Sequence, residues 1–131
     1  MAAHRELIEV KGREIVVPAV AMGAARFGFA DLCEKPLGAR DYLAIARNYH
    51  TVFVEDVPVL HDNRRNEAKR FINLVDTFYD NRIRLVVSAE AEPQDLYQAT
   101  TGTEAFEFDR TVSRLIEMRS EEWVAQAGEA G

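Results

Sequence analysis

The sequence predicts an α/β domain built around a strand–helix–strand unit. Two short runs rich in β-branched and other apolar residues, 51–55 and 83–88, are typical of strands that are covered on both faces, as in a parallel sheet. Between them, residues 63–79 carry apolar side chains at helical spacing, which predicts one apolar helix face. A strand, a crossover helix and a second strand form a βαβ unit. We expect this unit to be the core onto which the rest of the chain packs.

The ends of this central helix carry residues that are typical of helix termini. Asp62 or Asn63 is expected to cap its start by accepting a hydrogen bond from a free backbone N–H. Asp80-Asn81 is expected to end it. Lys69 and Asp76 fall outside the apolar face, so we expect them to remain in water.

A β-hairpin is predicted at the start of the chain. The runs 6–10 and 13–17 are separated by Lys11-Gly12, and two such runs joined by a glycine-containing pair are typical of a hairpin. Pro18 is expected to close the second strand. Residues 26–29 then predict a third short strand with two aromatic side chains.

Further helices and one more strand are expected beside the central unit. Residues 40–49 predict a helix, and residues 92–97 predict one helical turn that begins with a proline. Apolar and acidic residues alternate over 105–108, which favours a half-buried strand. Asp109 is then expected to cap a C-terminal helix that covers 110–118 or further.

Length and charge restrict the classes of function. The 131 residues fit a single domain, so we expect one α/β domain over 1–131. The net charge of −6 argues against binding to nucleic acid or to anionic lipid. The single cysteine, Cys33, allows no internal disulfide and favours a reducing, cytoplasmic location. The longest charge-free run, 15–25, is shorter than the roughly 18–20 residues of a membrane span, so no direct membrane insertion is expected.

The sequence offers few residues for metal binding or nucleophilic catalysis. The spacing of the three histidines and the cysteine matches no zinc pattern; they are His4, His50, His61 and Cys33. No activating base or oxyanion turn marks Cys33 and His50 as a nucleophile pair. We therefore predict no metal site and no catalytic residue of this kind.

An acidic pair, Glu55-Asp56, follows the first strand of the central unit. P-loop ATPases place acids at such a strand end to bind magnesium and to orient water. The order of the two acids is reversed here, and the phosphate loop GxxxxGK[ST] is absent, since none of Lys11, Lys35 and Lys69 follows a glycine. We therefore interpret the pair as acids at a solvated strand end.

Two arginines of the C-terminal helix are candidate ligands for an anion. Arg110 and Arg114 are four residues apart and share one helix face. Two guanidinium groups on one face can clamp a phosphate or a carboxylate. They can also form ion pairs within the chain, with Glu107, Asp109 or Glu117 as partners. The residues alone favour the ion pairs, and both interpretations stay open.

A series of motifs lies in order along the chain. They are FADLC (29–33), PLGARDYL (36–43), TVFVEDVP (51–58), RFINLVD (70–76), FYD (78–80) and FEFDRTVSRLIEM (106–118). No single motif is diagnostic, but their order and density, from about residue 10 to residue 123, resemble the C-terminal region of the AFG-type, ZapE-like P-loop ATPases.

This resemblance implies an AAA-like ATPase whose full-length form binds ATP and magnesium, hydrolyses ATP, and is linked to cell division or protein quality control. The phosphate loop is then expected upstream of this chain, which is interpreted as a C-terminal fragment. By the same resemblance, Arg70, Arg110 and Arg114 are candidates for a trans-acting arginine or a sensor of nucleotide state.

Two functions from different classes remain. The first is an accessory C-terminal domain, which binds no nucleotide or metal and catalyses nothing alone. Its partners are then the upstream ATPase domain and a client or cell-division protein, and the oligomeric state is left open. The alternative is a free-standing protein-interaction module without ATPase activity.

Overall fold

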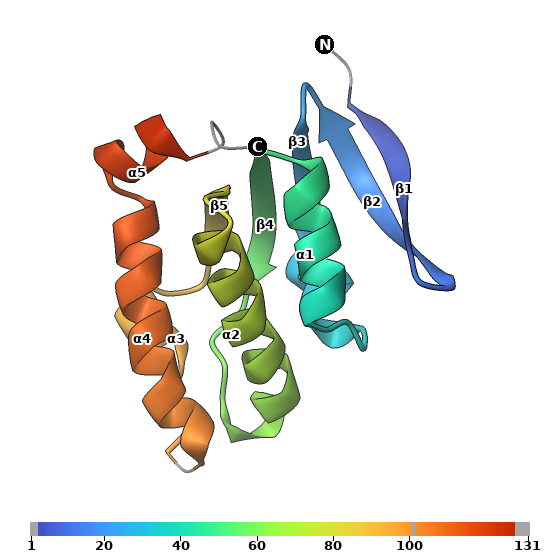
Figure 1. Ribbon diagram of the computed structural model, residues 1–131. Coiled ribbons are helices and arrows are strands. Elements are labelled where there is room, and N and C mark those ends of the chain that lie inside the picture. Colours follow the sequence, from blue (N-terminus) through green and yellow to red (C-terminus); the bar gives the residue numbers. More distant parts are fainter. Residues whose placement is uncertain (1–2, 101, 128–131) are drawn as a thin grey trace.

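The fold is described by a computed structural model that covers residues 3–100 and 102–127. A five-stranded sheet in the order β1-β2-β3-β4-β5 carries the chain (Figure 1). The strands are β1 His4–Val10, β2 Arg13–Ala21, β3 Ala24–Gly28, β4 Thr51–Val57 and β5 Arg84–Ala89. The pairs β1/β2 and β2/β3 are antiparallel, whereas β3/β4 and β4/β5 are parallel. The predicted α/β class is confirmed.

Helices α1, α2 and α4 lie side by side in one layer over one face of this sheet (Figure 1). The helical segments are the short π-helix η1 Ala30–Glu34, α1 Ala39–Asn48, the 3-10 turn η2 Asp62–Arg64, α2 Arg65–Asp80, α3 Pro93–Leu96, α4 Thr103–Met118 and α5 Glu121–Gln126. The helices predicted at 40–49 and 92–97 are confirmed as α1 and α3. The strand predicted at 26–29 is confirmed as β3, which begins two residues earlier than predicted.

The predicted βαβ unit is confirmed as β4, α2 and β5. Val52 lies opposite Leu85 and Val54 opposite Val87 in a parallel ladder. The core sits between this ladder and the helix layer, where Val52 and Val54 are 0% exposed. The expectation that both strands are covered on both faces is wrong for β5, because Val86 is 47% exposed on the face away from the helices.

The start of α2 differs from the prediction, and its end agrees. Asp62 and Asn63 belong to η2, and the residue before α2 is Arg64, which makes no side-chain capping hydrogen bond. The predicted caps are therefore wrong, because a 3-10 turn precedes the helix, which begins two residues later than predicted. The helix ends at Asp80 as expected, and the backbone N–H of Asn81 bonds to Thr77.

The N-terminal hairpin is confirmed, but its second strand is longer than expected. Lys11 and Gly12 have φ values of +32° and +84°, as a tight hairpin turn requires. Pro18 does not close β2, which continues to Ala21. The register with β1 shifts near this position, so the missing N–H of proline falls at an irregularity where the ladder is already interrupted.

The strand predicted at 105–108 is wrong, because these residues form the first turns of α4. Phe106 is 83% exposed, whereas Phe108 is buried. The buried positions of the helix follow a helical period from Glu104 through Phe108 and Leu115 to Met118. Asp109 consequently lies inside the helix and does not cap it, while the predicted end near Met118 is confirmed.

Candidate functional site

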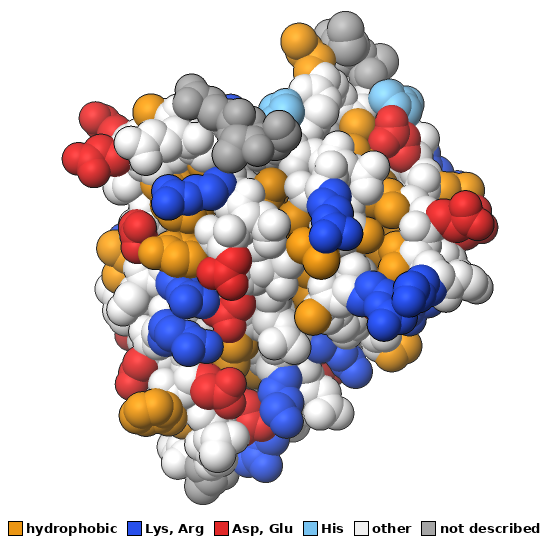
Figure 2. Space-filling view, in the orientation of Figure 1, with side chains coloured by type: hydrophobic (Ala, Val, Ile, Leu, Met, Phe, Trp, Pro, Cys, Tyr) orange, Lys and Arg blue, Asp and Glu red, His pale blue; other side chains and the backbone are white. Residues whose placement is uncertain are grey.

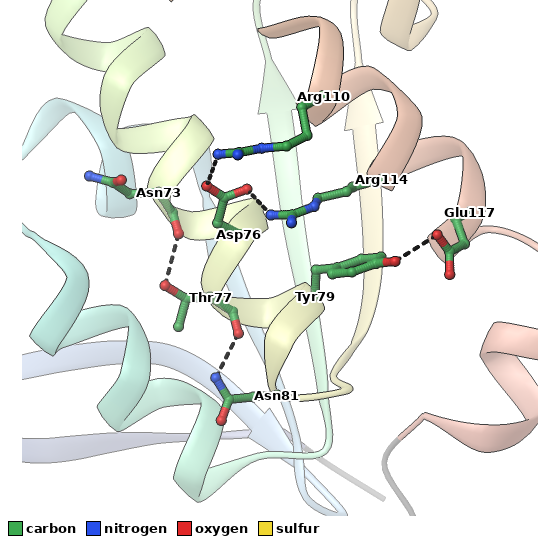
Figure 3. A network of polar contacts seen from close by, with 8 residues as sticks. All are labelled: Asn73, Asp76, Thr77, Tyr79, Asn81, Arg110, Arg114 and Glu117. Atoms are coloured by element: carbon green, nitrogen blue, oxygen red, sulfur yellow. Dashed lines mark hydrogen bonds and ion pairs between the residues drawn. The ribbon is translucent and has the colours of Figure 1, made fainter. Parts of the chain in front are cut away.

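The seam between α2 and α4 brings two of the candidate arginines onto one carboxylate (Figure 3). Asp76, on α2, accepts a hydrogen bond from the Arg110 guanidinium at 3.2 Å and a short one from Arg114. The two arginines are one helical turn apart on α4, so both side chains reach across the seam together. In the space-filling view, acidic and basic side chains alternate over these two helices (Figure 2).

Arg114 is held from a second side by an aromatic ring. Its guanidinium carbon lies 4.6 Å from the centroid of the Tyr79 ring, a cation–π distance. The Tyr79 hydroxyl donates to Glu117 Oε1 at 2.7 Å. This hydrogen bond to a carboxylate stabilises the protonated phenol and is the main reason that the pKa of Tyr79 is raised.

Aromatic packing fixes the two helices beneath these polar contacts. Phe71 of α2 and Phe108 of α4 stack with ring centroids 6.2 Å apart. Tyr79 stacks on Trp123 of α5 at 4.9 Å. The apolar stripes that the sequence places on both helices therefore set the spacing across which Asp76 meets the arginines.

The two arginines differ in how free they are to bind another anion. The Arg110 side chain is 59% exposed, whereas that of Arg114 is 22% exposed and lies between a carboxylate and an aromatic ring. The Asp76 carboxylate offsets only one of the two guanidinium charges, so the cluster of Asp76, Arg110 and Arg114 has a net positive charge. A phosphate that approaches Arg110 would compete with Asp76 for it.

The internal ion pairs favoured by the sequence are present, but with a different partner. The predicted partners Glu107, Asp109 and Glu117 all lie on the arginines' own helix, whereas the observed partner is 34 and 38 residues away along the chain. Asp76 was expected to remain in water, and its side chain is only 23% exposed. The sequence signal for it is weak: an acid beside the apolar stripe of a helix.

Arg70 makes a contact of a different kind. Its guanidinium donates to the backbone carbonyl of Cys33 at 2.9 Å and so ties the end of η1 to α2. Burial raises the pKa of the Cys33 thiol well above its usual range, which keeps it protonated and unreactive.

The acidic pair lies at the carboxyl end of β4, where open α/β sheets bind ligands. Glu55 and Asp56 are both exposed, as expected for a solvated strand end. Glu55 lies 4.0 Å from Arg26, and the backbone N–H of Asp56 donates to Ser88 Oγ at 2.9 Å. A shallow pocket of about 290 Å³ beside Asp56 is also lined by Arg64.

His4 and His50 each contact residues close to them in the fold and not each other. His50 Nε2 lies 2.9 Å from the carbonyl oxygen of Met22 and its Nδ1 lies 2.8 Å from Thr51 Oγ1. His4 pairs with Glu6 at 2.7 Å. Within residues 3–100 and 102–127, no three His, Cys, Asp or Glu side chains gather as metal ligands would. Over the same residues, no helix is long and apolar enough to span a membrane.

Comparisons with known proteins give this chain its relatives. The model of the AFG1-like ATPase family matches residues 1–127. The cell division protein ZapE of Escherichia coli is 40% identical over 124 residues, which cover 95% of this chain and 32% of ZapE. Lactation elevated protein 1 homolog B of Danio rerio is 35% identical over 91% of this chain and 30% of its own length. No solved structure matches.

An uncharacterized protein of Schizosaccharomyces pombe is also similar, at 32% identity over 93% of this chain. The chain spans about a third of the length of the curated relatives it matches. The match of the family model along almost the whole sequence agrees with the resemblance that the motifs predict. The chain belongs to the AFG1-like ATPase family.

Proposed function

We propose that this chain is the C-terminal accessory domain of a ZapE-like ATPase and that its α2–α4 seam responds to the nucleotide bound elsewhere in the full-length protein. The observation that carries the proposal is the net positive cluster of Asp76, Arg110 and Arg114, with the Arg110 side chain 59% exposed. The family assignment supports a role in ATP hydrolysis by the full-length protein.

ATP and magnesium are proposed to bind outside this chain. The 131 residues contain no GxxxxGK[ST] loop, whose backbone N–H groups and lysine would hold the phosphates. The chain also spans only about a third of its curated relatives, so the longer protein has ample sequence for that loop. On this view the chain alone neither binds nor hydrolyses ATP.

The proposed response of the seam to nucleotide is that Arg110 exchanges its ion pair with Asp76 for one with a phosphate. In the structure, Arg110 and Arg114 share Asp76. A phosphate near Arg110 offers that arginine bidentate charge-assisted hydrogen bonds that it need not share with Arg114. Arg110 then leaves Asp76, while Arg114 stays between Asp76 and Tyr79. Of the three candidate arginines, Arg110 is therefore the preferred sensor or trans-acting arginine. Arg114 and Arg70 instead hold neighbouring elements together.

The test is ATP hydrolysis by the full-length protein with Arg110→Ala. We expect kcat to fall at least about tenfold, as happens when a group that stabilises transition-state charge is removed, with the thermal midpoint nearly unchanged. Arg119→Ala is the matched control, because Arg119 also forms an exposed ion pair, with Glu92 at 3.2 Å, at the far end of α4. Unchanged turnover in the Arg110 variant would refute the sensor role.

A titration of the 131-residue chain with ATP and magnesium tests the proposal that both bind outside this chain. We expect no saturable binding and no phosphate release, whereas the full-length protein shows both. Hydrolysis by the chain alone would overturn the accessory role.

The relative ZapE is named a cell division protein. We therefore propose a cell-division protein or a client protein as the partner of this domain. We propose the cytoplasm as its location. A free-standing interaction module is the second candidate. Exposed apolar side chains on the sheet face away from the helices favour it, among them Leu7 at 56% and Val16 at 36% exposure. The reading frame upstream of Met1 separates the two, because a phosphate loop there supports the ATPase.

A further inference from the structure

Helix α4 extends past the edge of the sheet. Strand β5 is the last strand in the sheet order, and α4 lies beyond it in the helix layer (Figure 1). Packed helices are about 8–10 Å apart and paired strands about 4.7–4.9 Å apart, so one helix covers roughly two strands. Helix α2 connects β4 to β5 and covers them. The described residues supply no strand to the position under α4.

The side chains of β5 show the consequence. Val52 and Val54 of β4 are 0% exposed, whereas their ladder partners Leu85 and Val87 on the same face are only half-buried. A groove of about 480 Å³ opens beside them. Its apolar walls include Leu85, Val87 and Ala89 of β5 and Leu115 and Met118 of α4. The chain that follows β5 and the end of α4 add three charged residues to the lining, Glu90, Glu92 and Arg119.

Strand β5 also lacks the features that protect an edge strand. Its sequence, Arg-Leu-Val-Val-Ser-Ala, contains no proline, and its one charged residue, Arg84, stands at the first position, so the five positions that follow carry no charge that would discourage pairing. Val86, on the opposite face, is 47% exposed. On the face toward the helices, β5 carries only apolar side chains, Leu85, Val87 and Ala89, as interior strands of a parallel sheet do.

We propose that β5 pairs with a sixth strand, an extended segment with aliphatic side chains on one face, supplied by the part of the full-length protein that lies outside this chain. Its backbone adds to the free edge of β5, and alternate side chains fill the groove under α4. The proposal rests on the proposed function in one respect, namely that the native protein is longer than 131 residues. The curated relatives, about three times the length of this chain, support that segment as the source.

A second copy of the chain does not fit the same position. Pairing β5 with β5 across a two-fold axis normal to the sheet would place two α4 helices over one strand junction. Strands at about 4.8 Å cannot separate two helices that need about 8–10 Å. The occupant must therefore be a strand without a helix of its own above it.

Hydrogen exchange compares β5 in the 131-residue chain and in the full-length protein, both without nucleotide. We expect amide exchange across residues 84–89 to be at least tenfold slower in the full-length protein. Exchange across β1, the opposite edge of the sheet, is the internal reference. Equal exchange of 84–89 in the two proteins overturns the proposal. If the 131-residue chain is itself dimeric by light scattering, with 84–89 protected, the occupant is a second copy and the proposal is wrong.

A charged substitution in the groove gives the second measurement. Ala89 is exposed, so Ala89→Lys should leave the thermal midpoint of the 131-residue chain unchanged but lower that of the full-length protein by several degrees. Leu7→Lys, on β1, is the matched control and should affect the two proteins alike. Equal effects of Ala89→Lys in the two proteins contradict the sixth strand. Neither readout needs ATP turnover, so failure here and failure of the Arg110 test are distinguishable.

Discussion

Helix α2 has a neighbour on each side, and the two contacts depend on different forces. On one side lie α1 and η1, which both pack against α2 and are joined to each other by a buried hydrogen bond from the Tyr42 hydroxyl to the Leu32 carbonyl at 2.7 Å. On the side of α4, a partly exposed carboxylate, Asp76, joins two arginines. The first contact excludes water, whereas the second stays open to ions and to other charged molecules.

Two tyrosines show this difference in their ionisation. The pKa of Tyr42 is raised chiefly by burial, which disfavours the phenolate in an apolar surrounding. The pKa of Tyr79 is raised chiefly by the hydrogen bond to Glu117. On the α1 side, Arg70 of α2 donates to a neutral backbone carbonyl, that of Cys33, whereas the α4 side depends on the pairing of one carboxylate, Asp76, with two arginines. A contact of the second kind can be changed by a bound anion, which is what the proposed function requires.

Phe71→Ala should weaken both sides at once and have the largest effect. Phe71 is 0% exposed, and its ring centroid lies 6.2 Å from the ring centroids of both Phe29 and Phe108. Its loss removes buried apolar surface and leaves a cavity, so we expect the free energy of unfolding to fall by about 3–5 kcal/mol in urea titration. Phe106→Ala, at an 83% exposed position of α4, is the control and should change it by less than about 0.5 kcal/mol.

Asp76→Asn should weaken the α4 side alone. The substitution leaves Arg110 and Arg114 without their shared carboxylate. Because Asp76 is still 23% exposed and water screens the charges, we expect a loss of about 1–2 kcal/mol in urea titration. The loss should shrink in roughly 1 M salt, where exposed charges are screened.

Tyr42→Phe is the counterpart on the α1 side. It removes one buried donor and leaves the Leu32 carbonyl without that partner, at a cost of about 1 kcal/mol by urea titration. This cost should be the same at low and high salt, because no net charge changes. Equal salt dependence of the Tyr42 and Asp76 variants would contradict the proposed difference between the two sides.

Much of the fold could be predicted because each element of the βαβ unit carries its own period. The runs around Val52 and Leu85 are too short for helices and too apolar for loops, and the stripe from Ala68 to Phe78 has one helical phase. The alternation at 105–108 failed because four residues fit a strand and the first turn of a helix equally well. Only the longer spacing from Phe108 to Leu115 and Met118 separates the two.

The site could be predicted only in part, since its chemistry lies between elements. The spacing of Arg110 and Arg114 shows that they share a face, and their own helix offers acids enough to satisfy them. Their partner comes from α2, and which acid of α2 faces α4 depends on how the two helices pack. The sequence fixes no packing angle, so Asp76 could be identified only from the three-dimensional arrangement.

Glu117→Gln should produce the smallest effect and is the most selective test of the charge-dependent side. The substitution removes the carboxylate that accepts from Tyr79, so the pKa of Tyr79 should fall back toward its usual value near 10. Because the pKa of Tyr79 is higher in the folded than in the unfolded state, its protonated phenol stabilises the fold at pH values below the unfolded-state pKa. That contribution is lost as the pH rises through the folded pKa. The variant should therefore lose less stability than the parent between pH 10 and the raised pKa.

Tyrosinate absorbance measured on the chain and on Tyr79→Phe isolates the Tyr79 titration by difference. Glu121→Gln, an exposed acid of α5, is the control and should leave that titration in place. Tyr42 should keep its raised pKa in every one of these variants, since burial and not Glu117 is its principal cause. If Glu117→Gln leaves the Tyr79 titration unmoved, the α4 side does not depend on that charge, and the two neighbours of α2 differ less than their hydrogen bonds indicate.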